Sequence, residues 1–344
     1  MAGTWPSRTA YRQLVARLPC SLPLVLGTAM AGVAEFSGRA VLFPEGVALA
    51  WGAWTMHRPD WHALGPRLGL APVLCAACGL AAAVLLPSRL PAELAALTAA
   101  AVVIAVLRAA VGPALSAAVL PAVAGVRSGW YLLSVCIVAA AVLAGSRALD
   151  QLTPVRPGGT DPASARAPGA ALVTWIACAA WLSTAACLAL PLAAAAPPLL
   201  ASTSEWVSGQ PKGARAGARL GMLLTVVWAA GAATARQVRL LPAAAAMAML
   251  IAVAAMSAAR VAHPPAVAIA LVPMVFGPPA TWGALLAGAC SVAAAVTVLY
   301  LSGAAGSRLA AGWHVRQPHL PRLRMSLGAT SLRQSTKAAN RSQP

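Results

Sequence analysis

Residues 241 to 276 read LPAAAAMAMLIAVAAMSAARVAHPPAVAIALVPMVF, and this stretch decides the class of fold. The run before Arg260 carries no charged side chain and approaches the roughly 20 apolar residues that a helix needs to cross a bilayer core. Two prolines follow, Pro264 and Pro265, and a second apolar run begins with them. Because proline removes a backbone donor and clashes with the preceding turn, the first helix should stop near Arg260 and a new one should start at the prolines. The stretch therefore predicts a spanning helix followed by a break at membrane depth.

The whole chain has the composition of a membrane protein. Of its 344 residues, 60% are hydrophobic and only 9% are charged, whereas about a quarter of an ordinary soluble domain is charged. Apolar runs at 22–43, 68–86, 94–125 and 130–145 have counterparts in the second half of the chain. We predict an all-α fold, a polytopic bundle of transmembrane helices. The arginines before residue 20 would also fit a cleaved signal peptide, but a retained first span explains the same residues and suits the later spans.

An internal repeat appears when the chain is shifted by 152 residues. Alanine-rich chains match themselves at many shifts through alanine alone, but here tryptophan, proline and arginine recur at one constant shift. Such recurrence indicates tandem duplication of a folded unit. The shift superposes Trp54 on Trp206, Gly79 on Gly231, Arg108 on Arg260, Pro113 on Pro265 and Trp130 on Trp282.

Two copies of this unit organise the membrane part of the chain. Each copy combines long spans with short apolar pieces, which we expect to be broken or re-entrant helices. The equivalent loops 57–67 and 208–219 are both basic, so the copies should be parallel and each should cross the membrane an even number of times. The predicted organisation is a basic cytoplasmic N-terminus at 1–19, a first membrane repeat at 20–145, a linker loop at 146–169, a second membrane repeat at 170–302 and a basic, disordered cytoplasmic tail at 303–344.

The net charge of +18 is explained by a bilayer. In a soluble protein it would suggest binding to nucleic acid, which we do not expect here. Basic residues cluster in loops and at the ends, and the tail from Ser302 carries no acidic residue. Under the positive-inside rule both termini should be cytoplasmic in a multi-pass protein of the cell membrane, with anionic lipid headgroups as partners of the tail. The excess of arginine over lysine and the abundance of alanine indicate a GC-rich, bacterial genome.

The break before the second apolar run is the candidate site for a solute. A helix that starts at membrane depth directs its free amides and the positive end of its dipole inward, where an anion can bind. A buried arginine costs about 2.5–3.5 kcal/mol on insertion scales, so two at equivalent places suggest a shared aqueous path for small anions. In the alternative interpretation both arginines lie near helix ends and reach the headgroups, while the prolines only kink helices. The residues assigned to the path are Arg260, His263, Pro264, Pro265, Arg108 and Pro113.

Small residues recur where equivalent spans begin. Gly65 and Gly69, like Gly217 and Gly221, have the small-xxx-small spacing that lets helices approach closely. We expect these glycines to pack helices within the bundle, and the same spacing would permit a homo-oligomer.

The remaining polar residues do not predict catalysis. Glu45 and Glu205 could line a path, but we expect both at the level of the headgroups. Cys75 and Cys78 lie within an apolar run, where cysteines behave as small hydrophobes. The sequence has no phosphate loop, nucleotide fingerprint or nucleophile elbow, so we expect no enzyme, no cofactor and no metal site.

The stretch from Leu240 to Leu301 resembles the HPP family of integral membrane proteins, named after the tripeptide found here at His263-Pro264-Pro265. The similarity includes the alanine-rich span, Arg260, Gly277 and Trp282. Members of that family usually have one such unit, so the resemblance implies that the two copies form a fused pseudo-dimer. Plant relatives are associated with nitrite transport across the chloroplast envelope, which implies a nitrite-like solute.

These observations predict a membrane transporter or channel for a small solute, most simply a small inorganic anion. The alternative is a non-transporting membrane scaffold or subunit whose basic tail from Arg308 to Arg341 binds a partner or anionic lipid. The two functions differ in whether the membrane part alone moves a solute.

Overall fold

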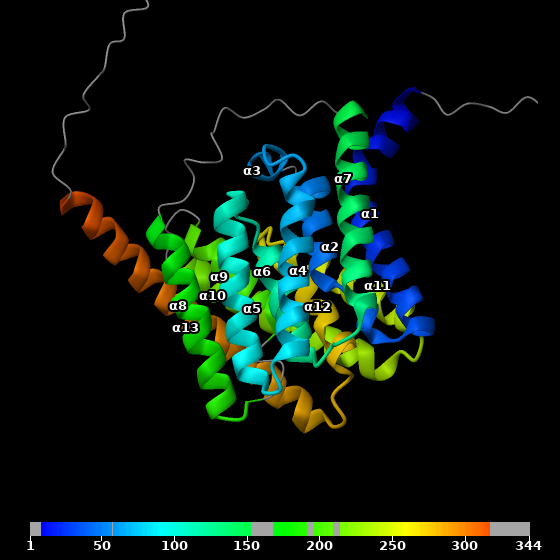
Figure 1. The fold of residues 1–344 in the computed structure, drawn as a ribbon. Helices are drawn as coiled ribbons and strands as arrows, with labels where there is room; N and C mark the ends of the chain where they lie inside the picture. Colours follow the sequence, from blue (N-terminus) through cyan, green and yellow to red (C-terminus); the bar gives the residue numbers. More distant parts are fainter. Residues whose placement is uncertain (1–7, 57, 153–167, 191–195, 209–213, 317–344) are drawn as a thin grey trace, which may run out of the picture. The chain divides into compact units, whose positions relative to one another are not determined.

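The computed structural model describes residues 8–56, 58–152, 168–190, 196–208 and 214–316, and every regular element within these ranges is a helix (Figure 1). The described residues up to Arg308 form one compact unit, and the end of the last helix, from Leu309, is separate from it. In chain order the elements are α1 (Arg8–Ser37), η1 (Arg39–Val41), α2 (Pro44–Ala50), η2 (Trp51–Thr55), α3 (Pro59–His62), α4 (Arg67–Leu85), α5 (Arg89–Leu107), α6 (Gly112–Ala124), α7 (Gly129–Leu152), α8 (Pro168–Cys187), α9 (Pro197–Ser208), α10 (Ala214–Gln237), α11 (Leu241–Ala259), α12 (Pro265–Phe276) and α13 (Trp282–Arg316).

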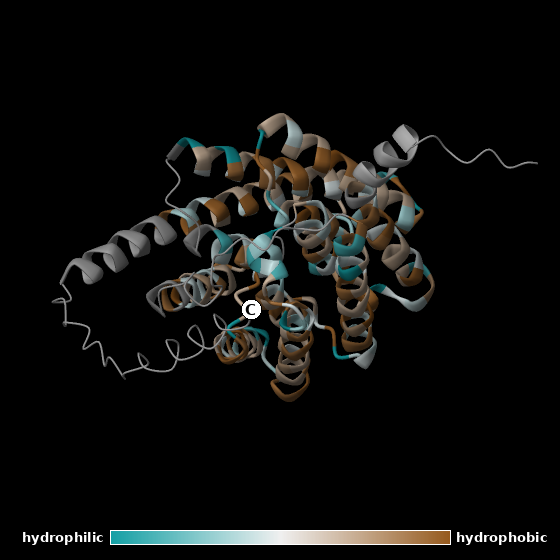
Figure 2. Cartoon of the chain, turned by 90° about the horizontal axis from the view of Figure 1, so that it is seen from above, coloured by the Kyte–Doolittle hydropathy of each residue, from teal (hydrophilic) through white to brown (hydrophobic). Residues whose placement is uncertain are grey.

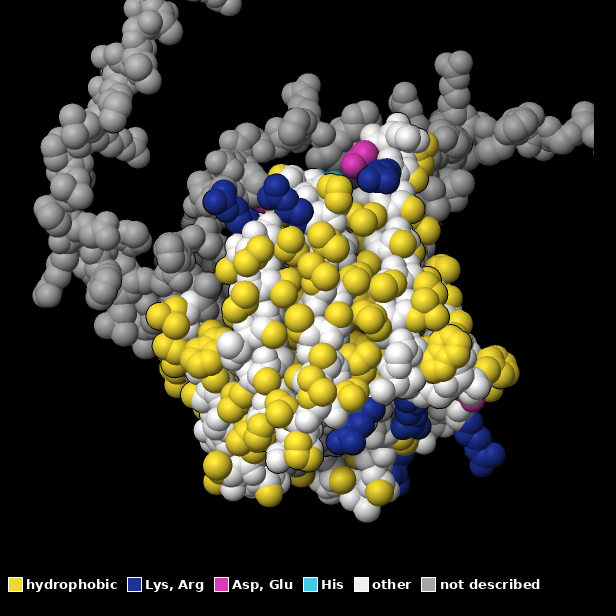
Figure 3. All heavy atoms as spheres, in the orientation of Figure 1, with side chains coloured by type: hydrophobic (Ala, Val, Ile, Leu, Met, Phe, Trp, Pro, Cys, Tyr) yellow, Lys and Arg dark blue, Asp and Glu magenta, His cyan; other side chains and the backbone are white. Residues whose placement is uncertain are grey.

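The predicted all-α fold is confirmed for the described residues, and seven of their helices are long and apolar enough to cross a membrane. They are Cys20–Ser37 of α1, α4, α5, α7, Arg215–Gln237 of α10, α11 and Trp282–Leu301 of α13. On the face shown in Figure 3 an apolar band separates two levels of arginine side chains. Seen from above in Figure 2, the long helices are largely hydrophobic and the hydrophilic segments lie mainly in loops and at helix ends.

Many large apolar side chains of the long helices face outward, and several small ones lie at the contacts between helices. Val106 and Ile137 are exposed by 76% and 61%, as expected of side chains that meet lipid tails. Ala76 and Ala100, on α4 and α5, are fully buried. Lipid tails are as apolar as leucine, so helices in a membrane associate through close packing of small residues rather than through burial of large ones.

Four short helices, α2, α6, α9 and α12, occupy the interior of the bundle. Helix α12 contacts the other three, and α6 also packs on α2 and α9. All of α2 and nearly all of α6 and α12 are buried. At 1.5 Å per residue, α6 and α12 are about 20 Å long, shorter than the roughly 30 Å hydrocarbon core. These short helices are stable because the longer helices shield them from lipid.

The boundaries of several helices recur 152 residues later. Helices α5 and α11 end at Leu107 and Ala259, and in each case the next residue, Arg108 or Arg260, has a left-handed backbone with φ 51° or 54°. The helix contacts also correspond at this shift, and each of these contacts joins a helix of the first half of the chain to a helix of the second half. The first helix of each half packs against the other half, α1 on α11 and α8 on α5, and the short helices do the same, α2 on α12 and α9 on α6.

Close helix contacts depend on glycines, but only partly on the predicted ones. A Cβ on Gly69 would meet Leu143, and one on Gly217 would overlap Tyr300, so both are packing residues. Gly221 has only Val296 nearby, at 3.5 Å. Gly65 does not pack: nothing lies within 4 Å of its Cβ position, and its φ of +53° shows that it serves the turn before α4.

The tightest approaches use Gly79 and Gly231, which the packing prediction omitted. A Cβ on Gly79 would overlap the carbonyl of Ala118, and one on Gly231 would overlap the carbonyl of Ala270. Helix α4 therefore lies directly against the backbone of α6, and α10 lies directly against the backbone of α12.

Several predicted boundaries need correction. The first span ends at Ser37 rather than at residue 43, because Gly38 leaves the helix with a φ of +89°. Residues 146–152, assigned to the linker, are the last turns of α7, and residues 303–316, assigned to the disordered tail, are helical in α13. The rest of the predicted linker and tail, at 153–167 and 317–344, lies outside the described residues.

Candidate functional site

The predicted break between two helices is present before α12. Arg260 ends α11 in a left-handed conformation, and the amide of Val261 returns to the carbonyl of Met256 at 3.0 Å. Pro264 caps α12 and Pro265 is its first residue. Between these two ends, the chain turns inward and buries His263, which is only 8% exposed.

Both ring nitrogens of His263 face polar groups of α9. The Nε2 atom lies 3.0 Å from Ser202 Oγ, and this hydroxyl also lies 2.9 Å from the carbonyl oxygen of Pro198. Because a carbonyl can only accept, Ser202 donates its proton there and must accept from His263, which places a proton on Nε2. The Nδ1 atom lies 3.8 Å from Glu205 Oε2, so a second proton on Nδ1 would face the carboxylate as an ion pair.

The Glu205 carboxylate is shared with a cation of the other half. Its Oε2 atom lies 3.3 Å from Nη1 of Arg58, in the loop before α3, and the Glu205 side chain is 9% exposed. Arg58 also pairs with Asp60 at 3.1 Å and lies 4.6 Å above the Trp61 ring. Arg58 is thereby held in one orientation, pointing at Glu205.

The start of α6 completes this arrangement. A Cβ added to Gly112 would lie 3.3 Å from Glu205 Cγ and 3.0 Å from the carbonyl of Ala201, so glycine permits α9 to approach α6 here. Ser116, one turn further along α6, donates to the carbonyl of Pro197 at 2.6 Å. We call Arg58, Ser202, Glu205 and His263 the Glu205 cluster; it joins residues of both halves.

The electrostatics of the Glu205 cluster favour an anion between Arg58 and His263. The carboxylate of Glu205 occupies that position, beside the amino end of α6, where the helix dipole also favours negative charge. A charged group buried to this extent needs such partners, since an unpaired ion in apolar surroundings is costly. Chemically, the cluster binds a carboxylate that belongs to the chain itself.

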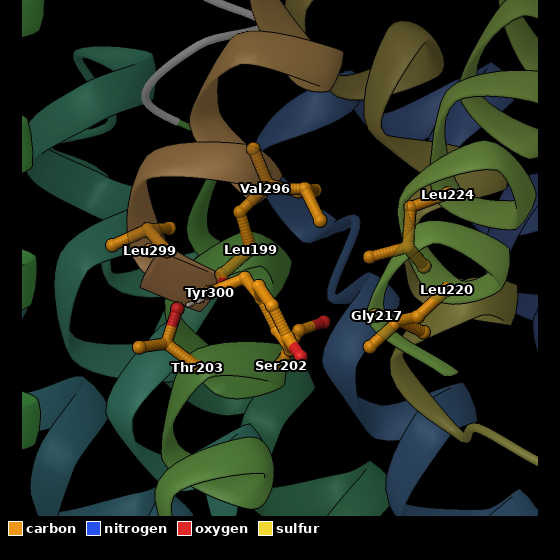
Figure 4. Close-up of a pocket in the computed structure, with 9 residues that line it drawn as sticks. All are labelled: Leu199, Ser202, Thr203, Gly217, Leu220, Leu224, Val296, Leu299 and Tyr300. Atoms are coloured by element: carbon orange, nitrogen blue, oxygen red, sulfur yellow. Dashed lines mark hydrogen bonds between the residues drawn. The ribbon is translucent and has the colours of Figure 1, made fainter. Parts of the chain in front are cut away.

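A small cavity lies on the other side of Ser202, with a volume of about 20 Å³, room for about one water molecule. Figure 4 shows its lining from α9, α10 and α13, with Ser202 and Tyr300 beside each other and the Thr203 hydroxyl bonded to Leu199. The polar wall of this cavity continues the cluster towards α13.

The structure separates the predicted path residues into two groups. His263, Pro264, Pro265 and Pro113 are buried, as expected of a broken helix inside the bundle. The two arginines expected in the path, Arg108 and Arg260, are exposed, and within the described residues neither side chain forms an ion pair. Their place directly after a helix end agrees with the alternative interpretation, in which the side chains reach the headgroups.

The prediction missed most of the Glu205 cluster. Arg58 belonged to a loop noted only for its basic character, and no pattern distinguished Ser202. Glu205 was expected at headgroup level, and its contacts with Arg58 and His263 were not foreseen. Glu45 was expected at the same level, and the structure buries it to 1% exposure. Arg58 meets Glu205 through contacts between the two halves of the chain. A pattern of neighbouring residues in the sequence does not contain such contacts.

Among the described residues, no group of histidine, cysteine or acidic side chains is arranged to hold a metal ion.

Comparisons with protein-family models, with curated proteins and with solved structures find no match for this chain. The resemblance of residues 240–301 to the HPP family therefore stays a prediction.

Proposed function

We propose that this chain is a membrane transporter for a small inorganic anion and that the anion binds in the Glu205 cluster. One observation carries the proposal: the partly buried cation Arg58, the buried His263 and the start of α6 converge on the carboxylate of Glu205, from both halves of the chain. Intramembrane ionisable residues are expensive and commonly mark ion pathways. The cluster lies at the interface between the halves, where transporters built from repeats hold their solutes.

Binding of the solute would displace Glu205. A small anion that takes the place of the carboxylate between Arg58 and His263 inherits its charge-assisted hydrogen bonds, so little electrostatic energy is lost in the exchange. Glu205 then swings away to solvent at the mouth of the site. Entry and exit of the anion are thus linked to movement of one side chain.

The proposed architecture is two tandem parallel copies related by a shift of 152 residues. The recurring helix ends at Arg108 and Arg260 and the exchanged packing of α1 and α8 support it. In this arrangement both termini and the linker lie on one side, which the basic residues make cytoplasmic. The HPP resemblance adds nitrite as the first anion to test.

Exposed Arg108 and Arg260 would act outside the binding site itself. Both residues directly follow helices that lead to the short helices α6 and α12. Cations near a path raise the local concentration of anions, an effect that salt screens. Their proposed role is attraction of the solute rather than its coordination.

Uptake into proteoliposomes tests the function. Purified full-length protein should take up nitrite, nitrate or chloride faster than protein-free vesicles, and deletion of residues 306–344 should leave this uptake in place because the Glu205 cluster is intact. The scaffold alternative predicts the reverse, namely no protein-dependent uptake and a loss of partner or lipid binding on deletion. Absence of uptake for all three anions would reject the transporter.

A further inference from the structure

Glu45 is a second buried carboxyl group, and the proposed anion site does not use it. It lies in the first turn of α2 and is 1% exposed. Neither carboxyl oxygen has a hydrogen-bond partner among the described residues. The contrast with Glu93 is instructive, because that side chain is equally buried but is bonded to Arg89 at 2.5 Å.

Among the side chains that the structure describes, no cation pairs with Glu45. Five elements pack against α2, namely α1, α6, α7, α12 and η2. Three of them contain no ionisable side chain: α6, α12 and η2. On α1, the carboxylate of Glu35 lies near the end of the helix and accepts a hydrogen bond from the amide of Leu241. Tyr131 on α7 interacts electrostatically with Glu45, and its neutral hydroxyl donates to the carbonyl of Ala117 at 2.8 Å.

The remaining side chains of α7 do not change this balance. Within its described length α7 also carries Cys136, Arg147 and Asp150, and Asp150 pairs with His62 at 3.6 Å. Arg147 lies four turns beyond Tyr131 on the same helix, roughly 24 Å along its axis at 1.5 Å per residue. Among the described side chains, Glu45 therefore has no charged partner.

An ionised carboxylate in such a place is unfavourable, so Glu45 needs a positive ligand. A metal cation would require several oxygen ligands, and among the described residues no group of acidic, histidine or cysteine side chains could hold one. A proton needs only one carboxyl oxygen. Proton relays through membranes are built from acidic side chains of this kind.

We propose that Glu45 is a proton-binding site and that the bound proton moves together with the anion. The proposal rests on the proposed transport function. Protonation converts the carboxylate to a neutral acid, and release on the other side restores the charge. Movement of one anion together with one proton transfers no net charge across the membrane. The contact between α2 and α12 links Glu45 to the helix that begins just after His263.

Chemical labelling tests the protonation of Glu45 without any transport assay. Dicyclohexylcarbodiimide reacts with protonated carboxyl groups in apolar surroundings, and peptide mass spectrometry locates the adduct. We expect an adduct on Glu45 in membranes at neutral pH and none on Glu93, whose carboxylate is paired with Arg89. Labelling of Glu93 but not of Glu45 would overturn the proposal, as would no labelling of either.

Coupled flux tests the role of that proton. In vesicles containing a pH-sensitive dye, an acidic exterior should drive accumulation of the anion and acidify the lumen beyond protein-free vesicles. E45Q should abolish accumulation driven by the pH gradient but keep exchange of internal for external anion, whereas the control E93Q should retain accumulation. Retained exchange also shows that E45Q is folded.

The outcomes separate this inference from the proposed function. If the wild-type protein exchanges anions but moves no protons, or if E45Q accumulates anion as the wild type does, the Glu45 site is rejected while transport stands. If the wild-type protein moves no anion at all, the transport function fails and coupling fails with it.

Discussion

Replacement of Gly231 by alanine is expected to disrupt the contact between α10 and α12. The new Cβ would overlap the carbonyl of Ala270, a backbone group that cannot turn aside. The two helices must therefore separate, and overpacking of this kind typically costs about 1–3 kcal/mol, occasionally more. We expect a clear fall in the midpoint of thermal unfolding in detergent, with loss of the monodisperse peak in size-exclusion chromatography.

Gly79→Ala should behave in the same way, because its Cβ would overlap the carbonyl of Ala118 between α4 and α6. Gly221→Ala is the matched control on α10, since its nearest neighbour is Val296 at an ordinary 3.5 Å. Alanine in a helix gains about 0.5–1 kcal/mol over glycine, so the control should be neutral or slightly stabilised. Equal behaviour of Gly231→Ala and Gly221→Ala would show that the close approach is not needed.

Replacement of Arg58 by glutamine should nearly abolish anion uptake. The change removes the one full-time cation of the Glu205 cluster, and charge-assisted hydrogen bonds contribute about 1.5–3 kcal/mol each. At about 1.4 kcal/mol per factor of ten, uptake at low anion concentration should fall by about ten- to a hundredfold. The measurement is the initial rate in proteoliposomes with equal amounts of reconstituted protein.

Arg67→Gln provides the control for Arg58→Gln. Arg67 begins α4 in the same basic region, is exposed and lies outside the cluster, so its loss should change uptake little. Arg58→Lys should give an intermediate rate, because lysine keeps the charge but not the planar, multiple donors. Equal rates for Arg58→Gln and Arg67→Gln would mean that only the overall positive charge matters.

The sequence predicts those features that depend on neighbouring residues along the chain. Charge-free runs predicted α4 and α11, and the paired prolines predicted the break before α12. The 152-residue shift predicted that Arg108 and Arg260 would occupy equivalent positions, and both end a helix in the same left-handed conformation. Gly79 and Gly231 also matched at this shift, so a signal for the closest helix contacts was present in the sequence.

Features that depend on contacts between the halves were not predictable in this way. Arg58 and Glu205 are far apart in the chain, and they meet because α9 of the second half packs on α6 of the first half. The burial of Glu45 has the same origin, since α2 is covered by α12 of the second half. A single sequence shows which residues could be buried, but the packing of the first half of the chain against the second determines which of them are.

The most direct test of the account is the concentration dependence of anion uptake by Glu205→Gln. If the carboxylate occupies the position of the solute between Arg58 and His263, its neutral isostere should bind the anion more tightly, and KM should fall by about tenfold, the equivalent of about 1.4 kcal/mol. An unchanged or higher KM in a folded Glu205→Gln protein would show that the anion does not take the place of Glu205, and the proposed site would be wrong.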